Sequence, residues 1–330
     1  MKADHLFVSI VVPTFNRRVL LARCLEALGN LDYPDDMYEV IVVNDGSTDD
    51  TRDYLEAHDR DFGFKLIVVS QENLGISSAR NNGIRHASGD IIAITDDDCI
   101  PEKDWLKLIA GGFTDYHVGG AGGTVQHDDP ATMVQRYIED TGLLSQEKFS
   151  SMNFLLAGSS AYRKKIMKGA GGYDEYLKSC EDVDMSIQAQ LKGFKLRYIP
   201  EAVVHHEHPA TWTHLFRQQY RNSIGFAQLH KKYVKDFNPG YNILILSYRI
   251  LFKAVTIPFT ILKAIIKGSG RYQIVKPALD MVILTSNISG IFVGTLFSRP
   301  YPGKPVEEKL GFIEDQSMTA LARKVGKKLF

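Results

Sequence analysis

Three consecutive aspartates, Asp96, Asp97 and Asp98, follow a short apolar run from Ile91 to Ile94. Such a run is typical of a buried parallel strand, which delivers the residues after it to the carboxyl edge of its sheet, where ligands bind. Neighbouring carboxylates repel one another, so a cation is expected to neutralise them. Carboxylate oxygens suit Mg²⁺ and Mn²⁺, which often keep positions open for substrate phosphates. The pattern therefore predicts a metal-assisted site for a phosphorylated substrate; the alternative for an acidic run is a solvated turn.

The segments that must position these acids alternate between strand-like and helix-like patterns. Short runs rich in Val and Ile predict strands at Val8 to Val12, Val40 to Val43, Leu66 to Val69 and Ile91 to Ile94. Helical periodicity predicts helices at 19–28, 51–58 and 76–86. This order favours an α/β fold with a doubly wound, mostly parallel, Rossmann-like sheet. The polar ends of the strands would then meet at one edge.

Two further strand ends carry polar residues. The first strand is followed by Pro13, Thr14, Asn16 and Arg17, and the second by Asp45 in the turn Asp45-Gly46-Ser47-Thr48-Asp49. Glycine permits a tight turn, and Thr48 or Asp49 can cap the next helix, so a capping turn is one interpretation. Asp45 precedes the cap, and its carboxylate can accept hydrogen bonds from a nucleobase or a ribose.

Several short motifs occur in order along about the first 230 residues. They are Val12-Pro13-Thr14-Phe15-Asn16-Arg17, Val43-Asn44-Asp45-Gly46-Ser47-Thr48-Asp49, Asn73-x-Gly75, Ala79-Arg80-Asn81-x-Gly83, Gly89-Asp90, Asp96-Asp97-Asp98, Gly171-Gly172-Tyr173-Asp174-Glu175 and Glu181-Asp182-Val183-Asp184. Each is weak alone, but their order and spacing resemble the family 2 glycosyltransferases with the GT-A fold. The resemblance implies an enzyme that takes a sugar from a nucleoside diphosphate sugar, with inversion at the anomeric carbon.

The resemblance also implies roles for individual residues. Asp45 would contact the base, Arg80 would help to hold the nucleotide and the acidic motif, and Asp96 with Asp98 would serve the ribose and a Mn²⁺ or Mg²⁺ ion. Asp98 is the expected direct metal ligand, because a diphosphate leaving group develops charge that a cation stabilises. The other expected donor-binding residues are Pro13, Thr14, Asn16, Arg17, Asn73, Gly75 and Asp97. Uridine is the expected nucleoside, while guanosine and thymidine remain open.

An inverting transfer needs a carboxylate that accepts the proton of the acceptor hydroxyl. Glu181 and Asp182 begin a predicted helix that ends near Gly193. The resemblance assigns the base to Asp182 and a supporting role to Glu181. In the alternative interpretation, these acids only stabilise the helix dipole, by roughly half a kcal/mol.

Other residues between and after these motifs complete the expected site. Gly158 is followed by Ser159, where family members often carry a polar residue such as asparagine, so the contact with the acceptor would be altered. Trp105 is expected in the core rather than as a sugar platform. Among His205, His206 and His208, we expect His206 to complete the metal shell, because imidazole is a common ligand; solvent exposure is the alternative in an alternating strand.

The sequence predicts a GT-A catalytic domain over residues 1–235 and a helical C-terminal region over 236–330. Apolar segments run from Ile243 to Ile266 and from Ile274 to Phe297, and neither is a clean transmembrane span. In the first, Arg249 and Lys253 would lie on one side of a helix, which suits the bilayer interface. A spanning helix, or packing on the catalytic domain or on a second copy, remains an alternative. Basic residues near the end, which are Arg323, Lys324, Lys327 and Lys328, would favour anionic lipid.

Composition narrows the function further. The chain has 39 basic and 39 acidic side chains, which gives no reason to expect a nucleic-acid partner. Three widely spaced cysteines, Cys24, Cys99 and Cys180, fit a reducing compartment, and no apolar secretory run is found before Pro13. We therefore expect an enzyme at the cytoplasmic face of the cell membrane that glycosylates a lipid-linked saccharide or a cell-envelope glycan. A homo-oligomer remains open.

Two other functions remain in view. A sugar nucleotidyltransferase would share the sheet and the acids, but it would normally show a loop rich in glycine and lysine near the first strand, which residues 13–17 do not resemble. A non-catalytic partner that binds nucleotide sugars would not need both Asp98 and Asp182.

Overall fold

The computed structural model describes residues 6–57, 62–127, 130–143, 145, 147, 153–233 and 239–298. Its contacts divide the chain into two compact units. The first unit consists of Met1–Asp128, Leu144–Glu175 and Glu181–Glu207, and the second of Asp129–Leu143, Tyr176–Cys180 and His208–Phe330. This division differs from the expected boundary at residue 235, because helix α9 (Trp212–Tyr233) belongs to the second unit.

The first unit is built on one mixed sheet in the order β3-β2-β1-β4-β7-β6-β8-β5. Its strands are β1 Val8–Thr14, β2 Tyr38–Asp45, β3 Lys65–Gln71, β4 Ile91–Ile94, β5 Cys99–Pro101, β6 Val118–Gln126, β7 Ser160–Arg163 and β8 Lys195–His206. The first four are parallel, as the sequence predicts, and β6 is parallel to β8. Strands β7 and β5 pair antiparallel to their neighbours.

Helices cover the sheet of the first unit on both faces. They are α1 Arg18–Gly29, α2 Thr51–Ala57, α3 Ile76–His86, α4 Trp105–Gly111, α7 Lys164–Ala170 and α8 Glu181–Leu191, with short 3₁₀ turns η1 Asp35–Met37 and η2 Ala157–Ser159. Every residue of β1 is buried, because its side chains alternate between two apolar clusters. Ile10 and Val12 pack in the cluster that contains Leu21 of α1, whereas Val11 packs in the cluster that contains Ala79 of α3.

Helix α3 lies unusually close to the sheet at Gly83. A Cβ atom at this position would lie 2.4 Å from Cγ1 of Val11, so only glycine fits without a shift. Arg80 precedes Gly83 by about one helical turn. The close contact therefore fixes the height of Arg80 above the sheet.

Strand β6 is rich in glycine because it lies between crowded neighbours. A Cβ atom at Gly120 would lie 2.7 Å from Cε1 of Tyr162, and one at Gly123 would lie 1.9 Å from the carbonyl oxygen of Ala202. The β6–β8 register shifts between Gly123 and Thr124. Side chains at these glycines would push β7 and β8 away from β6.

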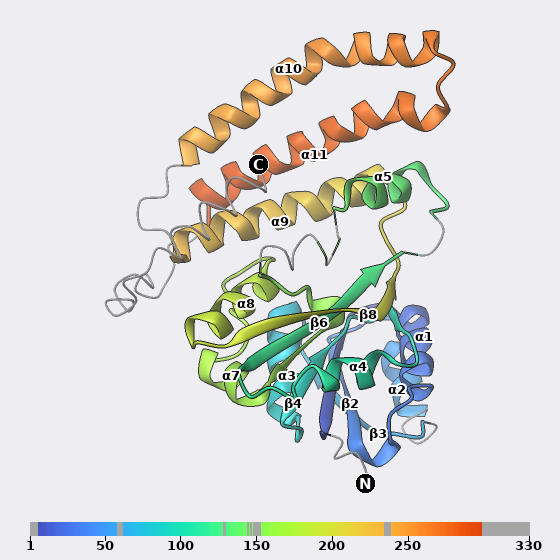
Figure 1. Cartoon of the computed structure of the whole chain (residues 1–330), viewed down its shortest axis with the longest axis vertical. Helices are drawn as coiled ribbons and strands as arrows, with labels where there is room; N and C mark the ends of the chain where they lie inside the picture. The colour runs from blue at the N-terminus through green and yellow to red at the C-terminus, as the bar shows by residue number, and fades with distance from the viewer. Residues whose placement is uncertain are drawn as a thin grey trace. The chain divides into compact units, whose positions relative to one another are not determined.

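The second unit contains four described helices, α5 Met133–Thr141, α9 Trp212–Tyr233, α10 Pro239–Ile266 and α11 Arg271–Leu296. Helix α11 packs against both α9 and α10, and α5 also contacts it (Figure 1). Among the described helices, α11 alone is long and apolar enough to cross a membrane. This result concerns length and composition alone, and it agrees with the spanning helix that the sequence left open as an alternative for this segment.

Candidate active site

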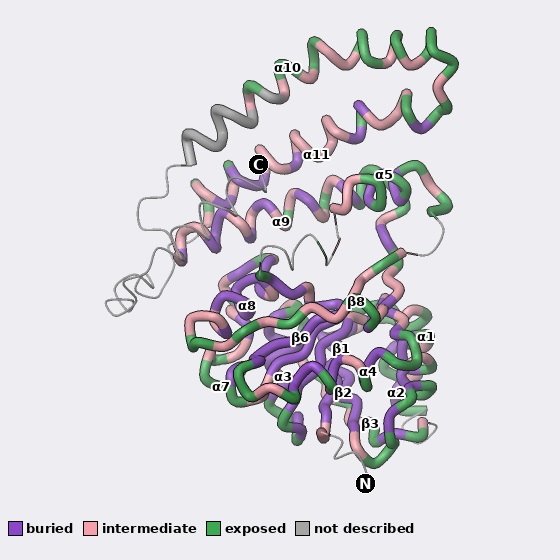
Figure 2. Tube along the Cα trace, viewed as in Figure 1, coloured by how far each residue is buried: buried purple, intermediate pink, exposed green. Residues whose placement is uncertain are grey.

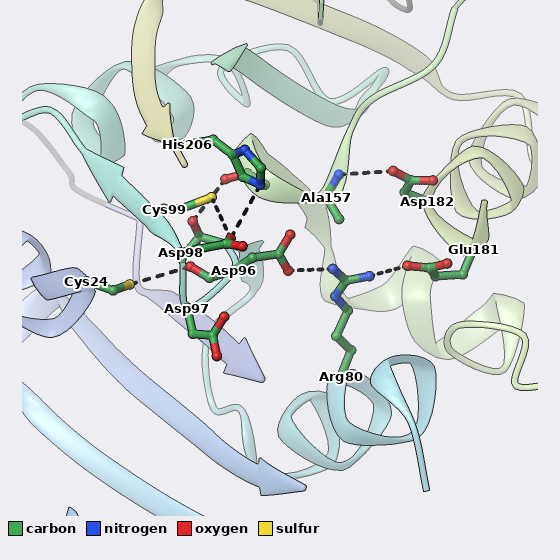
Figure 3. Close-up of polar contacts among 12 residues, drawn as sticks. Cys24, Arg80, Asp96, Asp97, Asp98, Cys99, Ala157, Glu181, Asp182 and His206 are labelled. Carbon is green, nitrogen blue, oxygen red and sulfur yellow. Dashed lines mark hydrogen bonds and ion pairs between the residues drawn. The ribbon is translucent and has the colours of Figure 1, made fainter. Parts of the chain in front are cut away.

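The acidic motif lies directly after β4, as expected. Thr95 follows the strand and donates a hydrogen bond of 2.9 Å to the carbonyl oxygen of Gly158, which fixes the chain before the acids. Strand β5 pairs with β8 so that Cys99 lies opposite His206. This pairing brings Nε2 of His206 to 3.5 Å from Oδ1 of Asp98 (Figure 3).

The three aspartates have different surroundings. Asp97 is buried and accepts hydrogen bonds from Oγ1 of Thr14 at 2.8 Å and from Nη1 of Arg17 at 3.0 Å. The same Arg17 nitrogen lies 2.8 Å from Oδ2 of Asp98. Burial raises the pKa of Asp97 to about 6, even though Arg17 opposes the shift. Asp97 therefore turns toward Thr14 and Arg17, whereas Asp96 and Asp98 are partly exposed.

Asp96, Asp98 and Cys99 place one ligand atom each within 4.8 Å of one another. Burial, together with the charges of Asp96 and Asp98, raises the pKa of the Cys99 thiol well above its ordinary value, so this group stays protonated and is a poor ligand for a hard cation. The donor set that remains is two carboxylates with the imidazole of His206 beside them. Carboxylate oxygens fit Mg²⁺ or Mn²⁺.

Arg80 connects this acidic motif to helix α8. Its side chain is buried, with Nη2 at 2.6 Å from Oδ1 of Asp96 and Nη1 bonded to Oε1 of Glu181 (Figure 3). The guanidinium carbon also lies 5.5 Å from the ring centre of Tyr173, a cation–π contact. Burial would lower the pKa of Arg80, but the charges of Asp96 and Glu181 hold it above its ordinary value. Arg80 thus remains a cation between two carboxylates.

Asp182 lies beside Glu181 at the start of α8, as the sequence predicts. Its Oδ2 accepts a hydrogen bond of 3.2 Å from the backbone of Ala157, and its Oδ1 accepts one of 2.7 Å from the backbone of Val183. Burial, with the negative charge of Glu181, raises the pKa of Asp182 to about 7. Because the side chain is still partly exposed, it can meet a substrate hydroxyl. A carboxylate in this state suits proton transfer near neutral pH.

Asp45 lies at the end of β2 and holds the next loop. Its carboxylate accepts hydrogen bonds from Nε2 of Gln71 at 2.8 Å and from the backbone of Leu74 and Gly75, both at 2.9 Å. These bonds fix the segment Asn73-x-Gly75. An ionised carboxylate has about four lone-pair positions, so Asp45 keeps capacity for one more donor. Its expected contact with a base stays a prediction.

Asn16 ties two loops at the carboxyl edge together. It has a positive φ of 54°, and its Oδ1 accepts hydrogen bonds from the backbone of Thr48 at 2.7 Å and of Asp49 at 3.3 Å. Its own backbone nitrogen donates to Oγ of Ser47 at 2.9 Å. The segment that contains Pro13 and Asn16 is therefore joined to the turn after β2.

Ser159 is held inside the protein. Its side chain is completely buried, and its Oγ accepts a hydrogen bond of 2.9 Å from Nε1 of Trp105. Trp105 is also fully buried, as expected. The structure gives Ser159 a protein partner rather than a position open to an acceptor. Gly158 lies close to the acids, because a Cβ atom there would make a tight contact of 3.3 Å with Sγ of Cys99 and would lie 3.9 Å from Oδ2 of Asp96.

The three histidines have different acidic neighbours. His206 lies beside Asp98, whereas Nε2 of His205 lies 3.1 Å from Glu102 and that of His208 lies 3.1 Å from Glu139. The sequence did not predict Tyr173 and Asn81 as parts of the site. The side-chain amide of Asn81 bonds both the nitrogen and the oxygen of Tyr173, at 2.7 and 2.9 Å, which fixes the ring against Arg80. Both residues occur within the motifs that resemble the family, and this was the feature of the sequence that could have indicated their place in the site.

Comparisons with known proteins agree with this arrangement. The family described as Glycosyl transferase family 2 matches residues 9–170, and the one described as Glycosyl transferase family group 2 matches residues 91–293. Glycosyltransferase AglE of Haloferax volcanii is 29% identical over 226 residues, which cover 68% of this chain and 74% of AglE. Probable glycosyltransferase YdaM of Bacillus subtilis is 30% identical over 242 residues, which cover 70% of this chain but only 57% of YdaM.

A solved structure supports the fold. Mannosyltransferase PcManGT from Pyrobaculum calidifontis, in complex with GDP-Man and Mn²⁺, matches with a TM-score of 0.69 at 19% identity and covers 90% of this chain and 89% of its own. At this identity the likeness concerns the fold, and it confirms the expected GT-A architecture. Together with the family matches, it shows that this chain belongs to the family 2 glycosyltransferases.

Proposed function

We propose that this glycosyltransferase moves a sugar from a nucleoside diphosphate sugar to a hydroxyl of a lipid-linked saccharide or cell-envelope glycan, with inversion at the anomeric carbon. The observation that carries the proposal is the position of Asp182. It lies beside Glu181, which Arg80 links to Asp96, so a proton acceptor and an acidic motif flank the same buried cation. An inverting transfer needs the proton acceptor on one side of the anomeric carbon, where the acceptor hydroxyl attacks, and the leaving-group site on the other, where the diphosphate departs.

In this mechanism, Asp182 accepts the proton of the acceptor hydroxyl as that oxygen attacks the anomeric carbon. The hydrogen bonds from Ala157 and Val183 hold its carboxylate in place. Arg80 pairs with Glu181, and the negative charge of Glu181 raises the pKa of Asp182, which makes Asp182 a stronger base. A proton acceptor with a pKa near the working pH is the most effective one.

The donor would bind at the acidic motif. Asp98, with Asp96 and His206, would hold Mn²⁺ or Mg²⁺, which would supply positive charge to the diphosphate leaving group. Arg17 reaches Asp97 and Asp98 through Nη1 alone, so its other N–H groups remain for phosphate oxygens. Asp45, with the loop that it holds, would contact the base. PcManGT was solved with GDP-Man and Mn²⁺, which supports this class of donor and cation.

The nucleoside can be tested by thermal unfolding of the full chain with UDP, GDP, dTDP or CDP, each with and without Mn²⁺. A ligand at about a hundred times its dissociation constant should stabilise the protein by roughly 2.7 kcal/mol. We expect one diphosphate to stabilise it, and only with the metal. Asp98→Asn should lose the metal-dependent part of this stabilisation. Asp32→Asn should keep it, because Asp32 is an exposed aspartate that pairs with Lys107 outside the acidic motif.

Turnover separates an enzyme from a non-catalytic nucleotide-sugar partner. The diphosphate identified by unfolding names the nucleoside of the donor. Metal-dependent transfer of sugar from donors with this nucleoside to acceptors in membrane extracts can then be followed by the release of the nucleoside diphosphate. NMR of the product should show the anomeric configuration opposite to that of the donor. Retention of configuration would contradict the role of Asp182, and binding without any turnover would favour the non-catalytic alternative.

A further inference from the structure

We propose that the exposed face of α10 binds the surface of an anionic phospholipid bilayer, with α10 lying in the plane of the membrane and α11 held by α5 and α9 instead of crossing it. The inference goes beyond sugar transfer, and it is tested without a donor. It rests on three observations within the second unit: an aligned apolar stripe, the charge around it, and the contacts of α11.

The apolar stripe consists of Tyr248, Leu251, Phe252, Val255, Phe259 and Leu262, each 55% to 70% exposed. Their spacing places all six along one face of the helix, over about 20 Å. No residue of α10 whose side chain is described, 247, 248 and 250–266, is buried (Figure 2). An exposed apolar surface of this length marks a place where another apolar phase binds.

The charge around the stripe selects an anionic surface. Between residues 237 and 279 the chain has no acidic residue and six basic ones, which are Arg249, Lys253, Lys263, Lys267, Arg271 and Lys276. Lys253 bonds to Asp280 and Lys276 pairs with Asp140, so both belong to contacts between helices of the second unit. Lys263 and Lys267, in contrast, are exposed near the end of the stripe. Each such cation near an anionic lipid surface contributes about 1 kcal/mol to binding.

Helix α11 is partly covered by its neighbours, although its composition would allow it to span: seven of its 26 residues are buried and most of the others are half-buried. Only five of its 26 residues are exposed, namely Arg271, Gln273, Ala278, Phe292 and Leu296. Near its start, Arg136 of α5 stacks on Tyr272 at 4.6 Å, and Tyr137 of α5 donates to Asp280 at 2.8 Å.

The second half of α11 packs against α9 in the same way. Ser223 donates to Asn287 at 2.9 Å, and a Cβ atom at Gly290 would lie 2.4 Å from the carbonyl oxygen of Tyr220. Helix α9 carries charged residues such as Arg217 and Lys231. If α11 crossed the bilayer, the polar helices bonded to it would enter the hydrocarbon region, which is strongly unfavourable. The outer face of α10 is therefore the one available to lipid.

Vesicle flotation of the full chain tests the surface. We expect binding to vesicles of phosphatidylcholine with phosphatidylglycerol, weaker binding to phosphatidylcholine alone, and a further decrease at high salt. Phe259→Asp should lower the partition coefficient at least about tenfold. Tyr248→Asp should also lower it, whereas Tyr116→Asp is a matched control, because the two tyrosines are 66% and 67% exposed. Unchanged binding of both α10 variants would overturn the proposal.

Cysteine labelling distinguishes a helix in the membrane plane from a spanning hairpin. Cys24, Cys99 and Cys180 are buried, so they give little background with an impermeant maleimide. Gly270 lies between α10 and α11 with φ of −61°, and a Cβ atom there meets nothing within 4 Å, so Gly270→Cys should fold normally. On protein bound to the outside of sealed vesicles, this cysteine should label as fully as Arg52→Cys. Protection of Gly270→Cys until detergent is added would show a spanning hairpin and overturn the proposal.

Sedimentation without vesicles tests the remaining occupant, a second copy of the chain. If the protein does not bind vesicles and Phe259→Asp converts a dimer to a monomer, the stripe is an interface between copies and the lipid proposal is wrong. A monomer that binds anionic vesicles supports it.

Discussion

The two ends of the same sheet treat their buried carboxylates differently. At the start of β2, the carboxylate of Glu39 is completely buried and accepts hydrogen bonds from Oγ of Ser9 at 2.8 Å, from both the backbone and the hydroxyl of Ser88 at 2.7 and 2.5 Å, and from Nζ of Lys65 at 3.0 Å. Burial alone would raise the pKa of Glu39, but these donors lower it to about 2. Its charge is fully compensated by the protein.

At the site, the balance is reversed. Asp97 and Asp182 have fewer donors than their burial requires, so their pKa values rise to about 6 and about 7. A carboxylate that only stabilises the fold gains from every donor that the chain can supply. A carboxylate that must bind a ligand or accept a proton cannot have all of its hydrogen bonds made by the protein. Groups with perturbed pKa values of this kind are common at functional sites. The comparison separates a structural acid from the reactive ones within one sheet.

The largest expected effect is that of Asp182→Asn. Removal of a general base should lower turnover by about 10² to 10⁴-fold and leave donor binding close to normal. The matched variant at the other end of the sheet, Glu39→Gln, should keep normal turnover per folded molecule. Steady-state kinetics with a donor titration measure both. Normal turnover of Asp182→Asn would remove the functional half of the comparison.

Arg80→Met should have the next largest effect, on stability. It leaves Asp96 and Glu181 without their cation, and breaking a buried pair in this way costs about 3 to 5 kcal/mol. Arg80→Lys should recover only part of this stability, because a single ammonium group cannot replace the planar guanidinium that bonds both acids. Urea unfolding measures the loss.

The control for Arg80 is Arg52→Met, since Arg52 forms an exposed pair with Glu56 one turn away. That change should cost less than about 0.5 kcal/mol. Equal losses at the two arginines would show that the link between the acidic motif and α8 contributes little.

The pH dependence of unfolding should have opposite signs at the two ends of the sheet. The folded pKa of Glu39, about 2, lies below its ordinary value of 4.5, so its contribution is present above pH 4.5 and is lost as the pH falls toward 2. Glu39→Gln should therefore lose roughly 3 kcal/mol at neutral pH and progressively less in acid.

For Asp182 the sign is reversed. Its folded pKa of about 7 lies above the ordinary value of 3.8, so ionisation costs stability as the pH rises between these values. Relative to wild type, Asp182→Asn should become more stable from pH 4 to pH 7. Chemical unfolding across this range measures both signs. Parallel curves for the two variants would refute the comparison.

The smallest expected effect concerns two neighbouring histidines. His206→Gln should weaken Mn²⁺ binding, in the presence of the donor nucleotide, by about tenfold, because the imidazole lies beside Asp98. His205→Gln should leave it unchanged, because His205 faces Glu102. Calorimetric titration with Mn²⁺ compares them. Equal affinities for the two variants would show that His206 is not part of the metal shell.

The parallel half of the sheet could be predicted because its strands are buried on both faces. Runs such as Val40 to Val43 carry that signal without knowledge of any partner. Strand β6, in the other half of the sheet, could not be predicted, since it has glycine where contacts with Tyr162 and Ala202 leave no space. A strand of this composition has no apolar pattern, and its reason lies in residues far along the chain.

The site divides in a similar way. The order of motifs pointed to Asp98, Arg80 and Asp182, and the structure brings Arg80 between the acidic motif and α8. The position of Ser159 could not be predicted, because its partner Trp105 lies 54 residues earlier. Local pattern indicates which residue types can react, whereas burial and long-range hydrogen bonds decide which of them are open to a substrate.

The hydrogen bond between Trp105 and Ser159 also gives the protein an optical reporter. The chain has only two tryptophans, and Trp212, in the second unit, is 62% exposed. Trp105 is completely buried beside the segment whose Gly158 faces Asp96. Its indole should emit at short wavelength and resist quenching by iodide, while Trp212 should emit at longer wavelength and be quenched readily. In Trp212→Phe, all of the tryptophan fluorescence would come from Trp105, next to Gly158 and the acidic motif, so donor binding could be followed there without a label.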